Sequence, residues 1–180
     1  MTISTRIAAR LARRIALGAA AIILPHFSPA ASAATAPAIV KAVVSSGTVR
    51  SGALVNVTVR IAGANNVGSV PFTLHYDTSI LELVASSPIE GGFLRADGAA
   101  TSFMAAAGPA SRGGGLVVGL SRLGSARGAR GKGTLCRLTF RARQPGVCPL
   151  SFSRASVLDP TGQPLASTFR GTSITVRGAP

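Results

Sequence analysis

Acidic residues are scarce in this chain. Its 180 residues include only five Asp and Glu, against nineteen Lys and Arg, and the formal net charge is +14. Histidine and cysteine number two each. A glycosidase site needs two converging carboxylates, and a zinc site needs several His or Cys ligands at characteristic spacing. So small a supply, spread along the chain, argues against both kinds of site, and no metal or cofactor is predicted.

Aromatic residues are also few: there is no Trp, one Tyr and seven Phe. Proteins that bind single-stranded nucleic acid stack the bases on aromatic side chains, and here the basic residues are scattered as well. The positive charge therefore does not predict a nucleic-acid partner, and it leaves an anionic polysaccharide, a lipid head group or an acidic protein. The missing Trp also argues against an immunoglobulin domain of antibody type, which buries one between its sheets.

Long apolar runs are absent apart from residues 15–24, which follow four arginines and precede Ala31-Ser32-Ala33. A bilayer span needs roughly 20 apolar residues, so this shorter run predicts a cleaved secretory signal over residues 1–33. A membrane-anchored N-terminal helix is the alternative. Cleavage near Ala33 leaves residues 34–180 as a single exported domain, periplasmic or extracellular, with no membrane span. His75 is then its only histidine.

Strand patterns follow the signal, and no helix is predicted. Apolar and polar residues alternate over residues 55–61, 72–76 and 136–142, the period typical of strands with one buried face. Shorter strands are predicted at residues 39–44, 101–106, 116–120, 148–152 and 173–176. About nine such strands bury their apolar faces when two antiparallel sheets pack together. The prediction is an all-β sandwich with jelly-roll topology, with an immunoglobulin-like topology as the alternative.

Turn-forming residues separate these strands. They occur at residues 64–66, 113–115, 144–146 and 159–162. The longest connection, SRLGSARGARGK at residues 121–132, is basic and rich in Gly, and it predicts a mobile loop.

Three separated segments resemble the cohesin domain family, the exported bacterial β-sandwich known from cellulosome scaffolds. The first, residues 46–84, contains FTLHYDTSILEL, which is similar to the family's F-x-L-x-Y-D-x-S-x-L-E-L pattern. The second is GKGTLCRLTFRAR at residues 131–143, and the third is PLSFSRASVLDPTGQPL at residues 149–165. They occur in the family's order, and the resemblance extends from about residue 39 to residue 176.

The resemblance implies a non-catalytic binding module, because cohesins hold dockerin-bearing proteins on one sheet face. The expected partner is a dockerin-like or other acidic protein, or a polysaccharide. A structural or assembly subunit of a cell-envelope or secretion complex is the alternative, and no enzyme activity is predicted.

The resemblance also implies a position for the partner-binding face. If the family's strand order holds, the strand with Thr73 and His75 lies beside the strand with Arg137, Thr139 and Arg141. The predicted face is therefore Ser69, Thr73, His75, Arg137, Thr139 and Arg141. The family often has Asn or Asp just before the first of these strands, and this chain instead has Ser69 and Pro71. A basic face would favour an acidic partner and salt-sensitive binding; a solvated face that prevents aggregation is the alternative.

His75 and Asp77 lie two residues apart and would point the same way in a regular strand. This suggests the base and the carboxylate of a Ser-His-Asp site, in which the carboxylate orients the histidine. However, Asp77-Thr78-Ser79 is also typical of a turn whose carboxylate caps backbone N–H groups. The turn is the prediction, with His75 facing solvent. Likewise, Asp159-Pro-Thr-Gly resembles a calcium loop only superficially and predicts a type I turn that ends at Gly162.

Cys136 and Cys148 leave two alternatives open. An exported chain with an even number of cysteines favours a disulfide. The turn at Pro145 lies nine residues from one cysteine and three from the other, so a direct hairpin would separate them along the strands. A bridge, which needs Cα atoms within about 7 Å, would form only between strands of different sheets that cross. Two buried thiols are the alternative.

Overall fold

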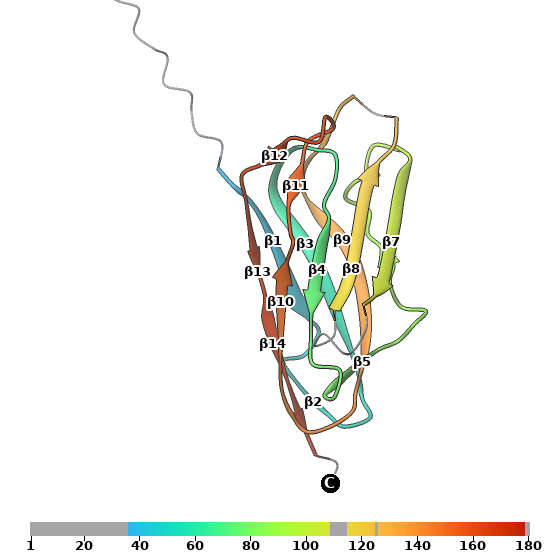
Figure 1. Ribbon diagram of the computed structural model, residues 1–180, viewed down its shortest axis with the longest axis vertical. Helices are drawn as coiled ribbons and strands as arrows, with labels where there is room; N and C mark the ends of the chain where they lie inside the picture. Colours follow the sequence, from blue (N-terminus) through green and yellow to red (C-terminus); the bar gives the residue numbers. More distant parts are fainter. Residues whose placement is uncertain (1–35, 109–114, 125, 179–180) are drawn as a thin grey trace, which may run out of the picture. The chain divides into compact units, whose positions relative to one another are not determined.

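The structure is a computed structural model that describes residues 36–108, 115–124 and 126–178. These residues fall in one compact unit, residues 34–180. The predicted signal segment lies outside them. The described residues form strands and turns and no helix, so none of their segments is a helix that could span a membrane. Figure 1 shows the strands arranged as two layers.

The first sheet has six strands. Its order is β13-β1-β3-β9-β5, and β6 also pairs with β9. The strands are β13 (Ser167–Arg170), β1 (Ala38–Val44), β3 (Leu54–Val67), β9 (Ala129–Ala142), β5 (Leu81–Leu83) and β6 (Ile89–Glu90). The two long strands, β3 and β9, pair along most of their length and form the centre of this sheet.

The second sheet also has six strands, in the order β2-β14-β10-β4-β8-β7. The strands are β2 (Thr48–Arg50), β14 (Thr172–Arg177), β10 (Gly146–Ser153), β4 (Phe72–His75), β8 (Gly115–Arg122) and β7 (Thr101–Ala107). In Figure 1, β10, β4, β8 and β7 run side by side in front of β1, β3 and β9. A small hairpin, β11 (Val157–Leu158) with β12 (Pro164–Leu165), completes the described strands.

The predicted β-sandwich is confirmed, with one difference in detail. Most strand pairs are antiparallel, but β1 pairs with β13 and β14 pairs with β2 in the parallel direction. The parallel partners β13 and β2 are both edge strands. The fourteen described strands exceed the nine expected because several are pieces of only two or three residues.

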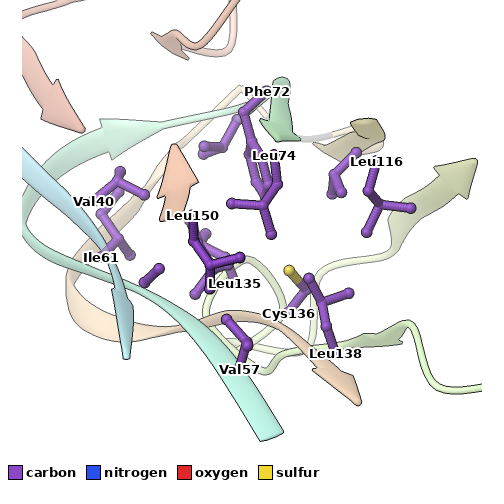
Figure 2. Packing of buried hydrophobic residues seen from close by; sticks show 14 of the residues in the cluster. Val40, Val57, Ile61, Phe72, Leu74, Leu116, Leu135, Cys136, Leu138 and Leu150 are labelled. Atoms are coloured by element: carbon purple, nitrogen blue, oxygen red, sulfur yellow. The ribbon is translucent and has the colours of Figure 1, made fainter. Parts of the chain in front are cut away.

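The core lies between the sheets, and the three predicted apolar stripes supply much of it. Every member is buried: Val55, Val57, Val59 and Ile61; Phe72, Leu74 and Tyr76; Cys136, Leu138, Phe140 and Ala142. Figure 2 shows side chains of both sheets directed into this shared core. Tyr76 directly follows β4 of the second sheet, and Phe140 lies on β9 of the first. Their rings pack edge to face across the core, with centroids 4.9 Å apart. Alternation alone thus identified the inward face of each strand.

Two predicted connections are shorter than the sequence suggested. Residues 64–66 lie within β3 and form bulges rather than a turn, where Gly63 and Asn66 have φ values of 68° and 59°. Such left-handed positions favour Gly and Asn, the residues that also favour turns. Half of the predicted loop at residues 121–132 is likewise taken up by strands, since β8 ends at Arg122 and β9 begins at Ala129.

The two cysteines are free thiols, and both are fully buried. Cys136 lies on β9 opposite Val59, and Cys148 lies on β10 opposite Ile174. The strands therefore belong to different sheets, yet no bridge forms. Burial raises the pKa of Cys136 to about 12 and also raises the pKa of Cys148, which keeps both thiols in their unreactive protonated form.

Candidate functional site

Four strands of the second sheet, β10, β4, β8 and β7, expose no Lys, Arg, Asp or Glu on their outer surface, and we call this surface the neutral face. Exposed arginines, Arg50 of β2 and Arg177 of β14, lie beyond it on the other two strands of the sheet. The neutral face consists of Val147, Pro149, Ser151 and Ser153 of β10, Thr73 and His75 of β4, Gly115, Val117 and Gly119 of β8, and Ser102, Met104 and Ala106 of β7. His75 is the one ionisable member of this set. The face exists because each of these strands alternates, which directs Phe72 and Leu74 inward and Thr73 and His75 outward.

A hollow of about 510–520 Å³ is found at each of two places on or beside this face. The first hollow is lined by Thr73, His75, Gly108, Gly115, Val117, Ser153 and Arg154. Gly115 keeps it open: a Cβ at this position would lie 3.2 Å from Thr73 Cγ2 and 3.6 Å from His75 Nδ1. The second hollow is lined by Ser69, among others.

His75 is held by a serine from the neighbouring strand. Its Nε2 shares a hydrogen bond with Ser153 Oγ, since β4 and β10 pair antiparallel at this level. Asp77 is engaged elsewhere, because its Oδ1 accepts hydrogen bonds from Ser79 N at 2.8 Å and Ser79 Oγ at 2.6 Å. These bonds lower the pKa of Asp77. Asp77 therefore caps a turn. It does not orient His75, as the carboxylate of a Ser-His-Asp site would.

Ser69 lies in the separate second hollow. Its Oγ donates to Leu120 O at 2.9 Å and shares a hydrogen bond with Ser121 Oγ at 2.9 Å, while its N–H donates to Leu158 O. Asp159 lines the same hollow. Ser69 therefore ties β8 to β11, and the structure does not bring it into the hollow of Thr73 and His75.

The predicted arginines lie on the opposite side of the molecule, so the expectation of one shared face is wrong. Arg137, Thr139 and Arg141 belong to β9 of the first sheet, whereas Thr73 and His75 belong to β4 of the second. The physical reason is that β9 and β4 both alternate, and alternation does not specify which strand pairs with which. The reason to expect an acidic partner at Thr73 and His75 is therefore removed.

The outer surface of the first sheet is strongly cationic, and we call it the basic face. Its exposed cations are Lys41 of β1, Arg60 of β3, Arg130, Lys132, Arg137 and Arg141 of β9, and Arg170 of β13. Arg141 lies opposite Glu82 of β5. Thr139 donates its hydroxyl proton to Asn56 Oδ1 at 2.9 Å, and its backbone is bonded on the other side by Ser87. Part of the predicted site is thus already occupied by intramolecular contacts.

The acidic turn at residues 159–162 forms as predicted. Asp159 Oδ1 accepts hydrogen bonds from Thr161 N at 2.8 Å, Thr161 Oγ1 at 2.7 Å and Gln163 N at 2.9 Å, which lower its pKa. Gly162 N donates to Asp159 O at 3.0 Å and closes the turn. Asp159 therefore caps its own hairpin. Within residues 36–108, 115–124 and 126–178, no three His, Cys, Asp or Glu side chains gather as a metal site would require.

Comparison with protein families gives a match to the cohesin domain over residues 40–174. The chain belongs to the cohesin domain family. A search of curated protein sequences finds no match. The strand order of this cohesin domain explains what the sequence missed: Gly115, Val117 and Ser153 contribute to the hollow only because β8 and β10 flank β4. Each is one unremarkable position in an alternating strand, so no local signal could have identified it.

Solved structures of cohesins share this fold at low sequence identity. A non-cellulosomal cohesin from Archaeoglobus fulgidus is 20% identical with a TM-score of 0.62, over 79% of this chain and 92% of that one. A type II cohesin–X-dockerin complex from Acetivibrio cellulolyticus is 16% identical with a TM-score of 0.66, over 78% of this chain and 99% of that one. A type I cohesin–dockerin complex from Clostridium thermocellum is 12% identical with a TM-score of 0.60, over 79% of this chain and 94% of that one.

Proposed function

We propose that this cohesin domain is a non-catalytic, extracytoplasmic module that binds a dockerin-like protein on its neutral face. The observation that carries the proposal is the family match over residues 40–174, together with structural neighbours that include complexes of a cohesin with a dockerin. An arginine-rich segment before an apolar run and a small-residue motif supports export.

The composition of the neutral face supports a protein partner. Its exposed apolar side chains are Met104, Val117 and Val147, with 58%, 43% and 61% of their surface accessible. They surround small hydroxyl and glycine positions, and Arg154 is the one Lys, Arg, Asp or Glu residue in the lining of the hollow. The centres of protein interfaces are likewise depleted of charge and enriched in Met and other apolar groups. Binding at this face is expected to depend only weakly on salt.

The bonds of the polar groups support a binding role rather than a catalytic one. His75 contacts Ser153, but the nearest carboxylate in sequence, Asp77, is committed to Ser79. A serine nucleophile needs both a base and a group that orients that base.

The test is a matched pair of substitutions, Val117→Arg and Val43→Arg. Both valines are exposed strand residues, 43% and 37% accessible, and they lie on opposite faces. Val117→Arg puts a charged side chain into the hollow of the neutral face, and we expect it to weaken the binding of a purified dockerin module by about 30-fold or more, as loss of a central contact does. Val43→Arg should leave the affinity within about threefold, since the basic face is not used.

Calorimetric titration of a panel of type I and type II dockerin modules measures both variants against the wild type. Loss of affinity in Val117→Arg alone supports the neutral face as the docking surface. Equal affinities of Val117→Arg and wild type would contradict that surface, and failure of the wild type to bind any dockerin would contradict a dockerin-like partner.

A further inference from the structure

Three cations of the basic face lie in one row across neighbouring strands. The register pairs Lys41 with Arg170 on one side and with Arg60 on the other. Neighbouring strands are about 4.8 Å apart, so the three side chains start from adjacent points on one line. Like charges directly opposite one another destabilise a sheet. The fold therefore maintains an unfavourable arrangement at this place.

A fourth cation joins the row from the next strand. Arg60 lies opposite Thr134 of β9, and Lys132 precedes that position by two residues. Lys41, Arg60, Lys132 and Arg170 together line a hollow of about 430 Å³, whose remaining walls include the apolar residues Ile39 and Val43. The row is thus the lining of a recess in the surface and not four charges scattered over a plane.

No acidic side chain of the chain compensates this row. All five acids lie in the described residues, and each has another position: Asp77 caps Ser79, Asp97 binds Arg122, Asp159 caps its own turn, Glu90 lies 3.7 Å from Arg95, and Glu82 lies opposite Arg141. None of them lines the hollow. The positive potential of the row is therefore available to a ligand from outside.

We propose that this hollow is a second binding site, separate from the docking face, and that it takes a linear anionic glycan that carries carboxylate or sulfate groups. Arg pairs with such groups through two parallel hydrogen bonds, and a row of cations across four strands can contact several charged groups of one extended chain. Ile39 and Val43 offer apolar surface to the C–H groups of the sugar rings. The absence of an aromatic side chain from the lining disfavours nucleic acid, whose bases need stacking partners.

The recess also distinguishes a glycan chain from a membrane. A planar bilayer touches the rim of a hollow, whereas one polymer chain can enter it and contact all four cations. A glycan at the basic face leaves the opposite sheet exposed, so one molecule could hold a dockerin-like protein and a cell-surface polymer together.

The experiment compares two triple variants that remove the same charge. The row variant is Lys41→Gln, Arg60→Gln and Arg170→Gln. The control is Arg137→Gln, Arg141→Gln and Arg143→Gln; the first two residues lie on β9, the exposed Arg143 follows that strand directly, and none of the three lines the hollow. Polygalacturonate and heparin are the anionic probes, and dextran is the neutral one. We expect the row variant to bind polygalacturonate about tenfold more weakly, as three exposed ion pairs predict, and the control to bind within about threefold of the wild type.

Thermal unfolding shows that both variants are folded; the row variant should be at least as stable as the wild type because it relieves repulsion. Equal losses in the two variants would contradict a localised site, since they would show attraction to overall charge. Tighter binding of an oligonucleotide or of phosphatidylglycerol vesicles than of either anionic glycan, with the same dependence on the row, would also overturn the proposal. The Val117→Arg variant should bind the glycan normally, which separates this site from the docking face.

Discussion

The two outer faces of this cohesin domain are built by the same alternation and differ in charge. The neutral face exposes serine, threonine, glycine and a few apolar side chains, with His75 as its one ionisable group. The basic face exposes seven cations and one opposing acid, Glu82. Seven of the ten cations carried by the described strands belong to the first sheet, whereas Arg50, Arg122 and Arg177 belong to the second. Two surfaces with different binding chemistry result from one simple pattern.

The difference also separates two kinds of open surface. The neutral hollow is open because Gly115 lacks a side chain beside Thr73 and His75. The basic hollow is lined by long cationic side chains that repel one another, and it can be stabilised by an anion. We therefore expect shape to govern recognition on the first face and charge to govern it on the second.

The largest expected effect comes from the core that both faces share. Phe140 is fully buried and packs against Tyr76. Phe140→Ala leaves a cavity between the sheets, and we expect it to lower the free energy of unfolding by about 3–5 kcal/mol. Urea denaturation measures this change, with Phe140→Leu, which removes less volume, as a milder control. A loss below about 1 kcal/mol would contradict this packing of Phe140. Both binding activities should fall together in Phe140→Ala, unlike in the surface variants.

A smaller effect on stability, dependent on pH, is expected from the ion pair between Asp97 and Arg122 of β8. Asp97 binds the largely buried guanidinium of Arg122, with Oδ2 2.7 Å from Nη2, and these contacts lower the pKa of Asp97 from 3.8 to about 2. A carboxyl whose pKa is lowered in the folded state stabilises the protein when the pH is above the ordinary pKa of that group. This contribution is lost as the pH falls through the pKa of the folded state.

Asp97→Asn should therefore be less stable than the wild type at about pH 6, and the difference should diminish towards about pH 2. Thermal unfolding of both proteins across this range measures the difference. A difference that stays constant with pH would show that the charge of Asp97 does not contribute to stability.

The smallest expected effects compare two cations of the basic face that have opposite surroundings. Lys41 lies between Arg60 and Arg170, whereas Arg141 lies opposite Glu82. Lys41→Gln should raise the free energy of unfolding by about 0.2–1 kcal/mol, and Arg141→Gln should lower it by a similar amount. Salt should diminish both changes. Changes of the same sign in the two variants would contradict the charge pattern of this face.

Much of the fold was predictable because a strand records its inward face locally. The stripes at Val55–Ile61, Phe72–Tyr76 and Cys136–Ala142 are all buried as predicted. The bulges near Asn66 were mistaken for a turn, since a left-handed residue serves either structure equally well. The site was predicted less well. Thr73 and His75 lie at a hollow, but Arg137 and Arg141 lie on the other sheet, and Ser153 and Gly115 gave no signal at all.

The sequence by itself determined the elements of this cohesin domain: where strands run, which of their side chains are buried and how much positive charge remains outside. These properties depend on neighbours along the chain, at a period of two residues. Only the tertiary structure decided the pairing, which brings His75 to Ser153 and Arg170 to Lys41 to Arg60. Every strand presents similar backbone donors and acceptors, so the choice of partner depends on how all the apolar faces pack at once.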